Sequence, residues 1–440
     1  MKTETEFLLS ARWIIPVEPA GIVLENHSLL VRDGLIAELF PTSDVQARYP
    51  ATRSLDLGQC ALIPGLINLH THAAMSLMRG LADDLPLMEW LERHIWPAEN
   101  KHVSHQFVAD GTLLGCAEML RAGITCFNDM YFFPEASAQS VLQSGMRAAV
   151  GIIAVEFPTA YAADAEDYLR KGLAVRDAFR AEPRLSFCMA PHAPYTVSDR
   201  SFEKILTLAD QLDLPIHLHL HETADEIRES LVQHKLRPLA RMQALGLLGP
   251  NLVAVHMVHL SEEEIEIVAE RGVHVAHCPG SNLKLASGIA PIARLAAKGA
   301  NIGLGTDSAA SNNRLDILNE ARTAALLAKG ASGDPTVVDA HRALAMATLD
   351  GARALGLDER IGSLRPGKAA DIVAIDLSGI ETSPCYDVAS QLVYAAGREH
   401  VSHVWVDGEL LVENRTLKTL DSQELAAKAA HWQRMLSNGH

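Results

Sequence analysis

Basic residues are in short supply in this chain of 440 residues, which has 38 Lys and Arg against 54 Asp and Glu and a formal net charge of −16. Nucleic acids and acidic membrane surfaces bind basic protein faces, so we expect neither as a partner. Long apolar runs are also missing, because none approaches the roughly 18 residues of a membrane span. The opening residues, Met1-Lys-Thr-Glu-Thr-Glu, lack the basic and apolar regions of a secretory signal. We therefore expect a cytoplasmic protein.

Closely spaced cysteine pairs are absent as well. The six cysteines are scattered, with no Cys-x-x-Cys motif among them: Cys60, Cys116, Cys126, Cys188, Cys278 and Cys385. This spacing argues against a structural zinc knot and against a disulfide framework. We expect reduced thiols, most of them buried.

The two ends of the chain have the pattern of a β domain. Short apolar stretches occur near residues 6–11, 28–32 and 35–39 and again near 371–376 and 403–412, with turn signals at Asp33-Gly34 and Asp407-Gly408. The stretch 422–435 is helical in composition. We therefore predict a small, discontinuous β-sandwich domain that is formed by residues 1–61 and 366–440 and carries a C-terminal helix.

The middle of the chain, residues 62–365, alternates strand-like apolar runs with helical stretches. No Gly-x-Gly-x-x-Gly motif follows its first strand, which argues against an open doubly wound sheet. Eight βα units predict an α/β fold of the (β/α)8 TIM-barrel type as the catalytic domain. The eight candidate strands are residues 65–72, 124–130, 147–155, 185–190, 215–221, 252–256, 273–277 and 301–306.

Histidines lie at the ends of several of these strands. The first ends in His70-Thr-His72, and residues i and i+2 of a strand point to the same side, so the two imidazoles aim at one point. The eighth strand ends in Asp307. Because all strand ends converge at the mouth of a barrel, these side chains form a candidate site for a catalytic divalent metal.

The fifth strand supplies a further ligand, but its spacing does not say which one. His217, His219 and His221 share one face by the strand period. A bound metal would lower the pKa of a water ligand, and His256 and Glu222 are the nearby candidates for moving protons.

Several motifs follow one another in order along nearly the whole chain. They are Pro64-Gly-Leu-Ile-Asn-Leu-His-Thr-His72, His219-x-x-Glu222, His256-Met-Val-His-Leu260, Gly305-Thr-Asp-Ser308 and Gly362-Ser-Leu-Arg-Pro-Gly-Lys-Ala-Ala-Asp-Ile-Val-Ala-Ile-Asp376, together with Arg79-Gly-Leu-Ala-Asp-Asp84 and Trp96-Pro-Ala-Glu99. As a set they resemble the amidohydrolase superfamily, and within it the branch of methylthioadenosine and S-adenosylhomocysteine deaminases.

This resemblance implies an aminohydrolase that cleaves a C–N bond of a cyclic amidine, with one divalent metal ion, zinc or alternatively Fe2+. The ligands it implies are His70, His72, His219 and Asp307. It further implies that Glu222 protonates the purine N1 and that His256 and Asp307 handle the hydrolytic water. The resemblance also implies that Glu99 binds the ribose hydroxyls, a role that spacing alone would not indicate. It implies that His192 contacts the substrate. The family also makes a homo-oligomer an expectation.

The substrate expected on this basis is a purine nucleoside, foremost 5′-methylthioadenosine, with S-adenosylhomocysteine or adenosine as further candidates. The family often has arginines after the third strand that reach the 5′ end, whereas residues 154–163 contain none, which favours a small apolar 5′ group. A guanine or cytosine deaminase, or a triazine-type chlorohydrolase, is the alternative on the same scaffold. A non-catalytic scaffold protein is a more distant alternative. The absence of one of the metal ligands from the sequence would indicate such a protein.

Overall fold

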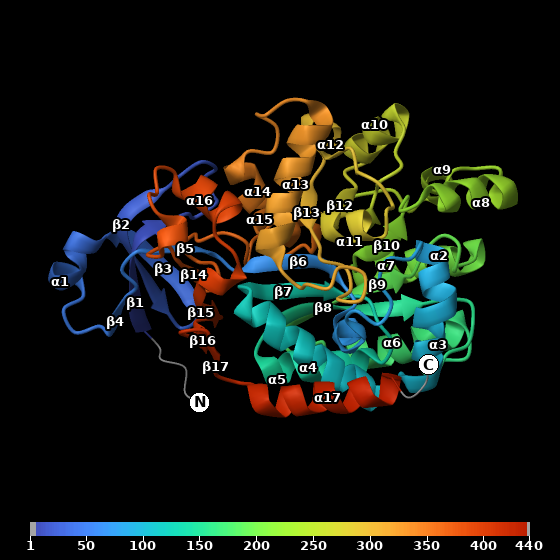
Figure 1. The fold of residues 1–440 in the computed structure, drawn as a ribbon, viewed down its shortest axis with the longest axis horizontal. Helices are drawn as coiled ribbons and strands as arrows, with labels where there is room; N and C mark the ends of the chain where they lie inside the picture. The colour runs from blue at the N-terminus through green and yellow to red at the C-terminus, as the bar shows by residue number, and fades with distance from the viewer. Residues whose placement is uncertain (1–5, 438–440) are drawn as a thin grey trace.

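A computed structural model describes residues 6–437, and its ribbon shows a barrel on one side and a smaller sheet on the other (Figure 1). The barrel sheet contains eight parallel strands in the order β13-β12-β11-β10-β9-β8-β7-β6. All eight predicted strands are present: β6 (Leu66–Thr71), β7 (Ile124–Asp129), β8 (Arg147–Ala154), β9 (Leu185–Pro191), β10 (Ile216–Leu220), β11 (Leu252–His256), β12 (His274–His277) and β13 (Ile302–Leu304).

Polar contacts between β6 and the residues after β13 close the ring. The backbone N–H of Asp307 donates to the carbonyl oxygen of His70 at 3.0 Å, and the side chain of Asn68 donates to the Thr306 hydroxyl at 2.7 Å. The (β/α)8 barrel expected from the sequence is therefore confirmed. Helices cover its outer surface: α4 (His105–Arg121), α5 (Pro134–Ser144), α6 (Ala165–Phe179), α7 (Asp199–Leu212), α8 (Ala224–His234), α9 (Pro238–Ala244), α10 (Glu262–Glu270), α11 (Pro279–Lys284), α12 (Ile292–Ala297), α13 (Ile317–Ser332), α14 (Ala340–Met346) and α15 (Leu349–Ala354).

The second sheet is mixed, has nine strands and combines both ends of the chain, as expected. Its order is β17-β16-β15-β14-β5-β1-β2-β3, with β4 paired to β1. We propose the domain limits expected from the sequence, residues 1–61 with 366–440 around 62–365; β5 continues the sheet to Pro64. The strands are β1 (Glu6–Ile14), β2 (Leu24–Arg32), β3 (Leu35–Pro41), β4 (Ser54–Asp56), β5 (Cys60–Pro64), β14 (Ile372–Asp376), β15 (Val401–Val406), β16 (Glu409–Glu413) and β17 (Thr416–Leu417).

Both predicted hairpin turns of this sheet are present. Asp33 and Gly34 have φ angles of 51° and 78°, and Asp407 and Gly408 have 49° and 71°. Two successive residues with positive φ are what a tight two-residue hairpin requires, and Asp-Gly tolerates that conformation best. Arg32 accordingly pairs with Leu35 across the first turn. The small helices of this domain are α1 (Val45–Arg48) and α16 (Val388–Tyr394).

Two segments matter for the site described below. The insertion after β6 forms a 3-10 helix (Ala73–Met78), α2 (Leu87–Trp90), a π-helical turn (Leu91–Ile95) and α3 (Trp96–His102). The C-terminal helix α17 (Ser422–Ser437) lies along α4 at the bottom of the view (Figure 1). The Trp432 indole on α17 donates to the buried carboxylate of Asp110 on α4 at 3.0 Å. The C-terminal helix is thereby fixed to the barrel.

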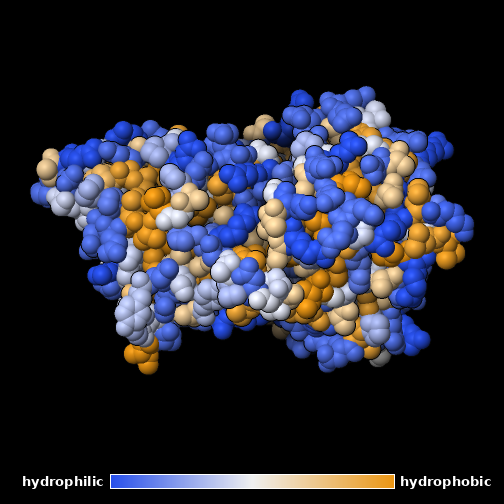
Figure 2. Space-filling view, turned by 90° about the horizontal axis from the view of Figure 1, so that it is seen from above, coloured by the Kyte–Doolittle hydropathy of each residue, from blue (hydrophilic) through white to orange (hydrophobic). Residues whose placement is uncertain are grey.

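The stretch between β10 and β11 forms two helices, α8 and α9, instead of one, because Lys235 has a φ of 58° and Pro238 begins the second. The face in Figure 2 is largely hydrophilic, with hydrophobic side chains gathered in separate patches. No helix within residues 6–437 combines the length and the apolar character needed to cross a membrane.

Candidate metal centre and substrate cavity

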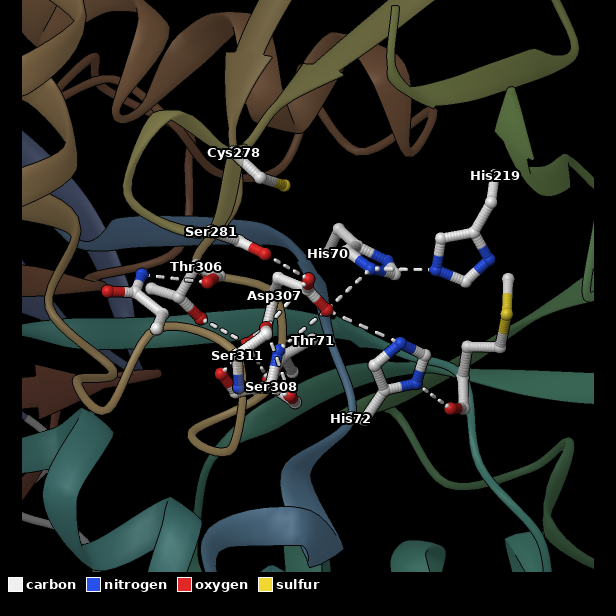
Figure 3. A network of polar contacts seen from close by, with 12 residues as sticks. His70, Thr71, His72, His219, Cys278, Ser281, Thr306, Asp307, Ser308 and Ser311 are labelled. Atoms are coloured by element: carbon white, nitrogen blue, oxygen red, sulfur yellow. Dashed lines mark hydrogen bonds and ion pairs between the residues drawn. The ribbon is translucent and has the colours of Figure 1, made fainter. Parts of the chain in front are cut away.

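Four potential metal ligands meet at the mouth of the barrel. One ligand atom each from His70, His72, His219 and Asp307 can be chosen so that all lie within 4.8 Å of one another. Nε2 of His70 lies 3.3 Å and Nε2 of His72 lies 3.4 Å from Oδ1 of Asp307. Figure 3 shows both imidazoles beside this carboxylate. His219 approaches from β10, with its Nε2 3.2 Å from that of His70. Three imidazoles and a carboxylate form a donor set suited to a divalent metal.

The ring orientations of these histidines are set by their other nitrogen atoms. His219 donates its Nδ1–H to the carbonyl oxygen of His192 at 2.7 Å, and His72 donates its Nδ1–H to the carbonyl oxygen of Met130. Nδ1 of His70 lies 2.9 Å from Nε2 of His217. These contacts at Nδ1 fix the tautomer, and they leave Nε2 of each ring free toward the centre.

The fifth-strand histidines have three different surroundings. Only His219 belongs to the cluster, while His217 holds the ring of His70. His221 donates Nδ1–H to the carbonyl oxygen of His259 at 2.9 Å, and its Nε2 accepts the backbone N–H of Leu239 at 2.9 Å. Both nitrogens of His221 are therefore engaged in joining β10 to neighbouring loops, and it is unable to reach the centre.

Asp307 is held by donors that the sequence did not single out. Its Oδ2 accepts the hydroxyl hydrogens of Ser281 at 2.6 Å and Ser311 at 2.8 Å, and its Oδ1 accepts the backbone N–H of Ser308 at 2.7 Å (Figure 3). The neighbouring histidines hold the pKa of Asp307 well below its usual range despite the opposing effect of burial. The backbone of Asp307 has a φ of 59°, a strained value for a residue other than glycine.

Glu222 and His256 lie beside the cluster. Nε2 of His256 is 3.7 Å from Oε2 of Glu222, and Nδ1 of His256 lies 2.9 Å from Oδ1 of Asn282. Burial raises the pKa of Glu222. Glu226 accepts the backbone N–H of Glu222 at 2.8 Å and so fixes the turn that carries it. A carboxyl group with a raised pKa keeps its proton to a higher pH than usual, which suits it to act as a general acid.

A cavity of about 310 Å³ opens over the centre and is lined by His72, His219, Glu222, His256 and Asp307 at one end. Glu99 on α3 lines it as well and accepts the hydroxyl hydrogen of Tyr131 at 2.7 Å. Burial raises the pKa of Glu99 to about 7, against the lowering effect of the Tyr131 hydrogen bond. His192 also lines the cavity, with Nδ1 3.0 Å from the Thr196 hydroxyl, and burial lowers its pKa to about 3.

The remaining walls are mainly apolar. The insertion after β6 contributes one wall, and the segment after β8 contributes another. The apolar side chains of these two walls are Met75, Leu87, Trp90, Leu91, Ile95, Trp96, Val103, Ile153, Val155, Phe157, Pro158 and Ala160, and Met130, Phe132 and Leu285 add to the apolar lining from the segments after β7 and α11. Arg147 lies away from them: its guanidinium is buried against Asp371, with Nε 2.8 Å from Oδ2, where it joins the barrel to the second sheet.

The cluster fits a divalent metal by its chemistry. Burial lowers the pKa of His70 to about 4 and that of His219 well below its ordinary value, so both rings are neutral at pH 7. Metal binding requires neutral imidazole and ionised carboxylate, and Asp307 supplies the latter. No further protons need to be removed from these three residues before an ion binds.

Comparison with known proteins agrees with this geometry. The model of the amidohydrolase family matches residues 61–411. A 5-methylthioadenosine/S-adenosylhomocysteine deaminase of Saccharophagus degradans is 48% identical over 432 residues, covering 98% of this chain and 97% of the relative.

Two solved structures extend the comparison. The crystal structure of an adenosine deaminase from Xanthomonas campestris with bound zinc has a TM-score of 0.96 at 49% identity and covers 98% of both chains. An atrazine chlorohydrolase from Arthrobacter aurescens with zinc has a TM-score of 0.89 at 24% identity, covering 97% of this chain and 100% of the other. At that identity the second likeness concerns the fold alone.

Proposed function

Because this chain belongs to the amidohydrolase family and is a metal-dependent hydrolytic deaminase, we propose that it deaminates 6-aminopurine nucleosides, with 5′-methylthioadenosine as its preferred substrate. The products would be 5′-methylthioinosine and ammonia. The relative that is 48% identical is named for 5-methylthioadenosine and S-adenosylhomocysteine, and the relative with bound zinc is named for adenosine.

The observation that carries the nucleoside assignment is the half-buried carboxyl group of Glu99. It lies in the wall of the same cavity as the metal ligands, and its position is fixed by Tyr131. A carboxylate in an otherwise apolar wall is costly unless it binds something, and two vicinal ribose hydroxyls are matching donors. A free base has no such hydroxyls and would leave this group unused.

The residues around the metal centre have separate roles in the proposed reaction. His70, His72, His219 and Asp307 would hold the ion, which when bound lowers the pKa of water enough to supply hydroxide near neutral pH. Glu222 donates a proton to N1 of the purine, which makes C6 more electrophilic.

His256 and the carboxylate of Asp307 accept and relay the proton of the hydrolytic water. His192 positions the base. The C6–N6 bond breaks as the leaving amine receives a proton, and ammonia departs.

The apolar walls favour methylthio over a charged 5′ substituent. Val155 and Phe157 line the cavity, and no arginine occurs over residues 154–163. The carboxylate of the amino-acid tail of S-adenosylhomocysteine would find no cationic partner in this stretch. We expect that substrate to be used less efficiently than methylthioadenosine.

Zinc is the metal that we propose, with Fe2+ as the alternative, because zinc is bound in the 49%-identical relative. The net charge of −16 supports the proposal that nucleic acids and membranes are not partners. We further propose a cytoplasmic location and a homo-oligomeric assembly.

The direct test is ammonia release from a panel of methylthioadenosine, S-adenosylhomocysteine, adenosine, guanine and cytosine, with the metal content measured in parallel. We expect the highest kcat/KM for methylthioadenosine. A preference for guanine or cytosine would overturn the nucleoside assignment, and full metal loading without any ammonia release would favour the non-catalytic alternative.

A further inference from the structure

A second cavity, of about 510 Å³, has an unusual charge for this acidic protein. It shares no lining residue with the substrate cavity. Four arginines and one glutamate line it, together with polar and small apolar groups, so its lining carries a formal charge of +3. We call it the arginine cavity and define it by Arg79, Arg121, Arg398, Arg415 and Glu118.

These arginines come from four separate parts of the chain. Arg79 follows the 3-10 helix after β6, Arg121 ends α4, Arg398 begins the short 3-10 helix before β15, and Arg415 lies between β16 and β17. Figure 1 shows β17 leading into α17, which lies along α4, so the cavity lies where the barrel meets both the second sheet and the C-terminal helix. The four arginines are therefore brought together by the tertiary fold and not by their spacing in the sequence.

The lining carboxylate cannot neutralise the cluster, because two arginines share it. Arg398 donates to Oε1 of Glu118 at 2.6 Å, and Arg79 forms an ion pair with Oε2 of the same group. Arg398 also lies 4.0 Å from Oδ2 of Asp316, which is buried behind it. Glu118 additionally accepts the backbone N–H of Leu315 at 3.3 Å. Its oxygens are thus fully used.

Arg121 and Arg415 have no carboxylate of their own. Within residues 6–437, no acidic oxygen lies at ion-pair distance from either guanidinium. Nη1 of Arg415 instead donates to three backbone carbonyl oxygens, those of Arg398, Glu399 and Val401, at 2.7, 2.6 and 3.2 Å. Burial and the nearby positive charge of Arg121 lower the pKa of Arg415, an effect that Glu399 partly opposes.

We propose that the arginine cavity binds a small dianion, with a phosphate group as the chemical class that fits best. Guanidinium groups bind phosphate oxygens through paired hydrogen bonds, and several of them can surround one tetrahedral anion. A bound dianion would also relieve the mutual repulsion of Arg121, Arg398 and Arg415. The site is independent of the deaminase chemistry and would exist whether or not the proposed substrate is right.

Isothermal titration of the metal-loaded full chain with inorganic phosphate tests this proposal. We expect saturable binding that weakens about tenfold in Arg121→Gln, because one charged hydrogen-bonding partner is lost. Arg121→Lys should recover part of the affinity, since it keeps the charge but not the fork. The matched control is Arg228→Gln on α8, whose arginine pairs only with Asp225 at the surface and should leave phosphate binding unchanged.

Three outcomes would overturn the proposal. The first is the absence of saturable binding at millimolar phosphate. The second is binding that survives Arg121→Gln and Arg415→Lys but disappears when the metal is chelated, which would place phosphate at the metal cluster. The third is dissociation of an oligomer by Arg121→Glu without phosphate binding, which would make the cavity a contact for an acidic side chain of a second copy.

Further titrations identify the source of the dianion. Tighter binding of glycerol phosphate than of inorganic phosphate would indicate a phosphorylated metabolite. Tighter binding of succinate than of either would overturn the preference for phosphate.

Discussion

Tyr131 donates a hydrogen bond of 2.7 Å to the half-buried carboxyl group of Glu99, on the wall of the cavity that contains the metal-ligand cluster. The two residues come from different elements, since Tyr131 follows β7 and Glu99 belongs to α3. The phenol leaves three of the four lone pairs of an ionised Glu99 available to a ligand. This pair therefore defines the place of the sugar in the proposed complex.

Glu99 should make nucleoside binding depend on pH. Burial raises its pKa to about 7, so the carboxyl group is protonated at lower pH and loses an acceptor for the ribose hydroxyls. We expect KM for methylthioadenosine to rise as the pH falls through 7, and Glu99→Gln to raise KM about tenfold or more at pH 8. Steady-state kinetics between pH 6 and 8.5 measures both effects. The same pH slope in Glu99→Gln as in the wild type would count against this role.

Glu222→Gln should lower turnover much more than substrate affinity. The amide has no proton to give to N1, and proton transfer belongs to the transition state, so a loss of about 10²-fold or more in kcat is expected. KM should change little, because the amide has nearly the same shape. Metal content measured by mass spectrometry is the control. Near-normal turnover in a fully metal-loaded variant would contradict the assignment.

His219→Ala on β10 and His221→Ala directly after it form a matched pair. We expect His219→Ala to lose the metal, because one of the four ligands is removed. His221→Ala should keep the metal but lower stability by about 1–3 kcal/mol, because the backbone N–H of Leu239 loses its buried acceptor. Metal stoichiometry and thermal unfolding separate the two effects. Retention of a full metal complement by His219→Ala would refute the ligand set.

Gly305→Ala should destabilise the barrel next to the centre. A Cβ atom there would lie 2.9 Å from the backbone N and Cβ of His70 and from the Cys278 sulfur, where there is no space for it. We expect a loss of about 1–3 kcal/mol together with weaker metal binding. Gly330→Ala on α13 is the control: nothing lies within 4 Å of the new atom, and alanine should stabilise the helix by up to about 1 kcal/mol. Equal denaturation midpoints for the two variants would show the contact to be unimportant.

Ala160→Arg should shift the substrate preference. Ala160 is exposed and lines the cavity after β8, so a guanidinium there has room to reach the carboxylate of S-adenosylhomocysteine. We expect kcat/KM for S-adenosylhomocysteine to rise relative to methylthioadenosine by about fivefold, as for a partly exposed ion pair. Ala160→Met has similar bulk without the charge and should not produce this shift. A shift of the same size in both variants would indicate a steric cause.

The sequence predicted the positions of all eight barrel strands because each is a short apolar run followed by a turn or a helix. It also predicted which residue types meet at the mouth, since parallel strands bring their ends together. It left the choice among His217, His219 and His221 open, because strand period gives them a common face. Their roles depend on the partners of each ring: Nε2 of His217 lies against His70 on β6, whereas His219 and His221 donate Nδ1–H to carbonyl oxygens on the loops after β9 and β11.

Other residues of the site could be predicted from the sequence only weakly or not at all. Ser281 and Ser311 hold Asp307, yet a serine after a strand is too common to be singled out. The burial of Glu99 depends on how the insertion after β6 folds over the barrel, which local periodicity does not encode. The break between α8 and α9 did have a local signal, because Pro238 removes a helical N–H donor.

The second sheet can be completed only late in synthesis, because its paired strands come from the two ends of the chain. β5 pairs with β14, so Pro64 lies opposite Ile372 in the finished sheet, and β1 pairs with β5. During synthesis the first strands emerge long before their partner, and the whole barrel is made in between. An unpaired, apolar strand edge is prone to join the wrong neighbour. The nascent amino-terminal strands therefore need protection until translation is nearly complete, and a chain that stops early leaves that edge permanently open.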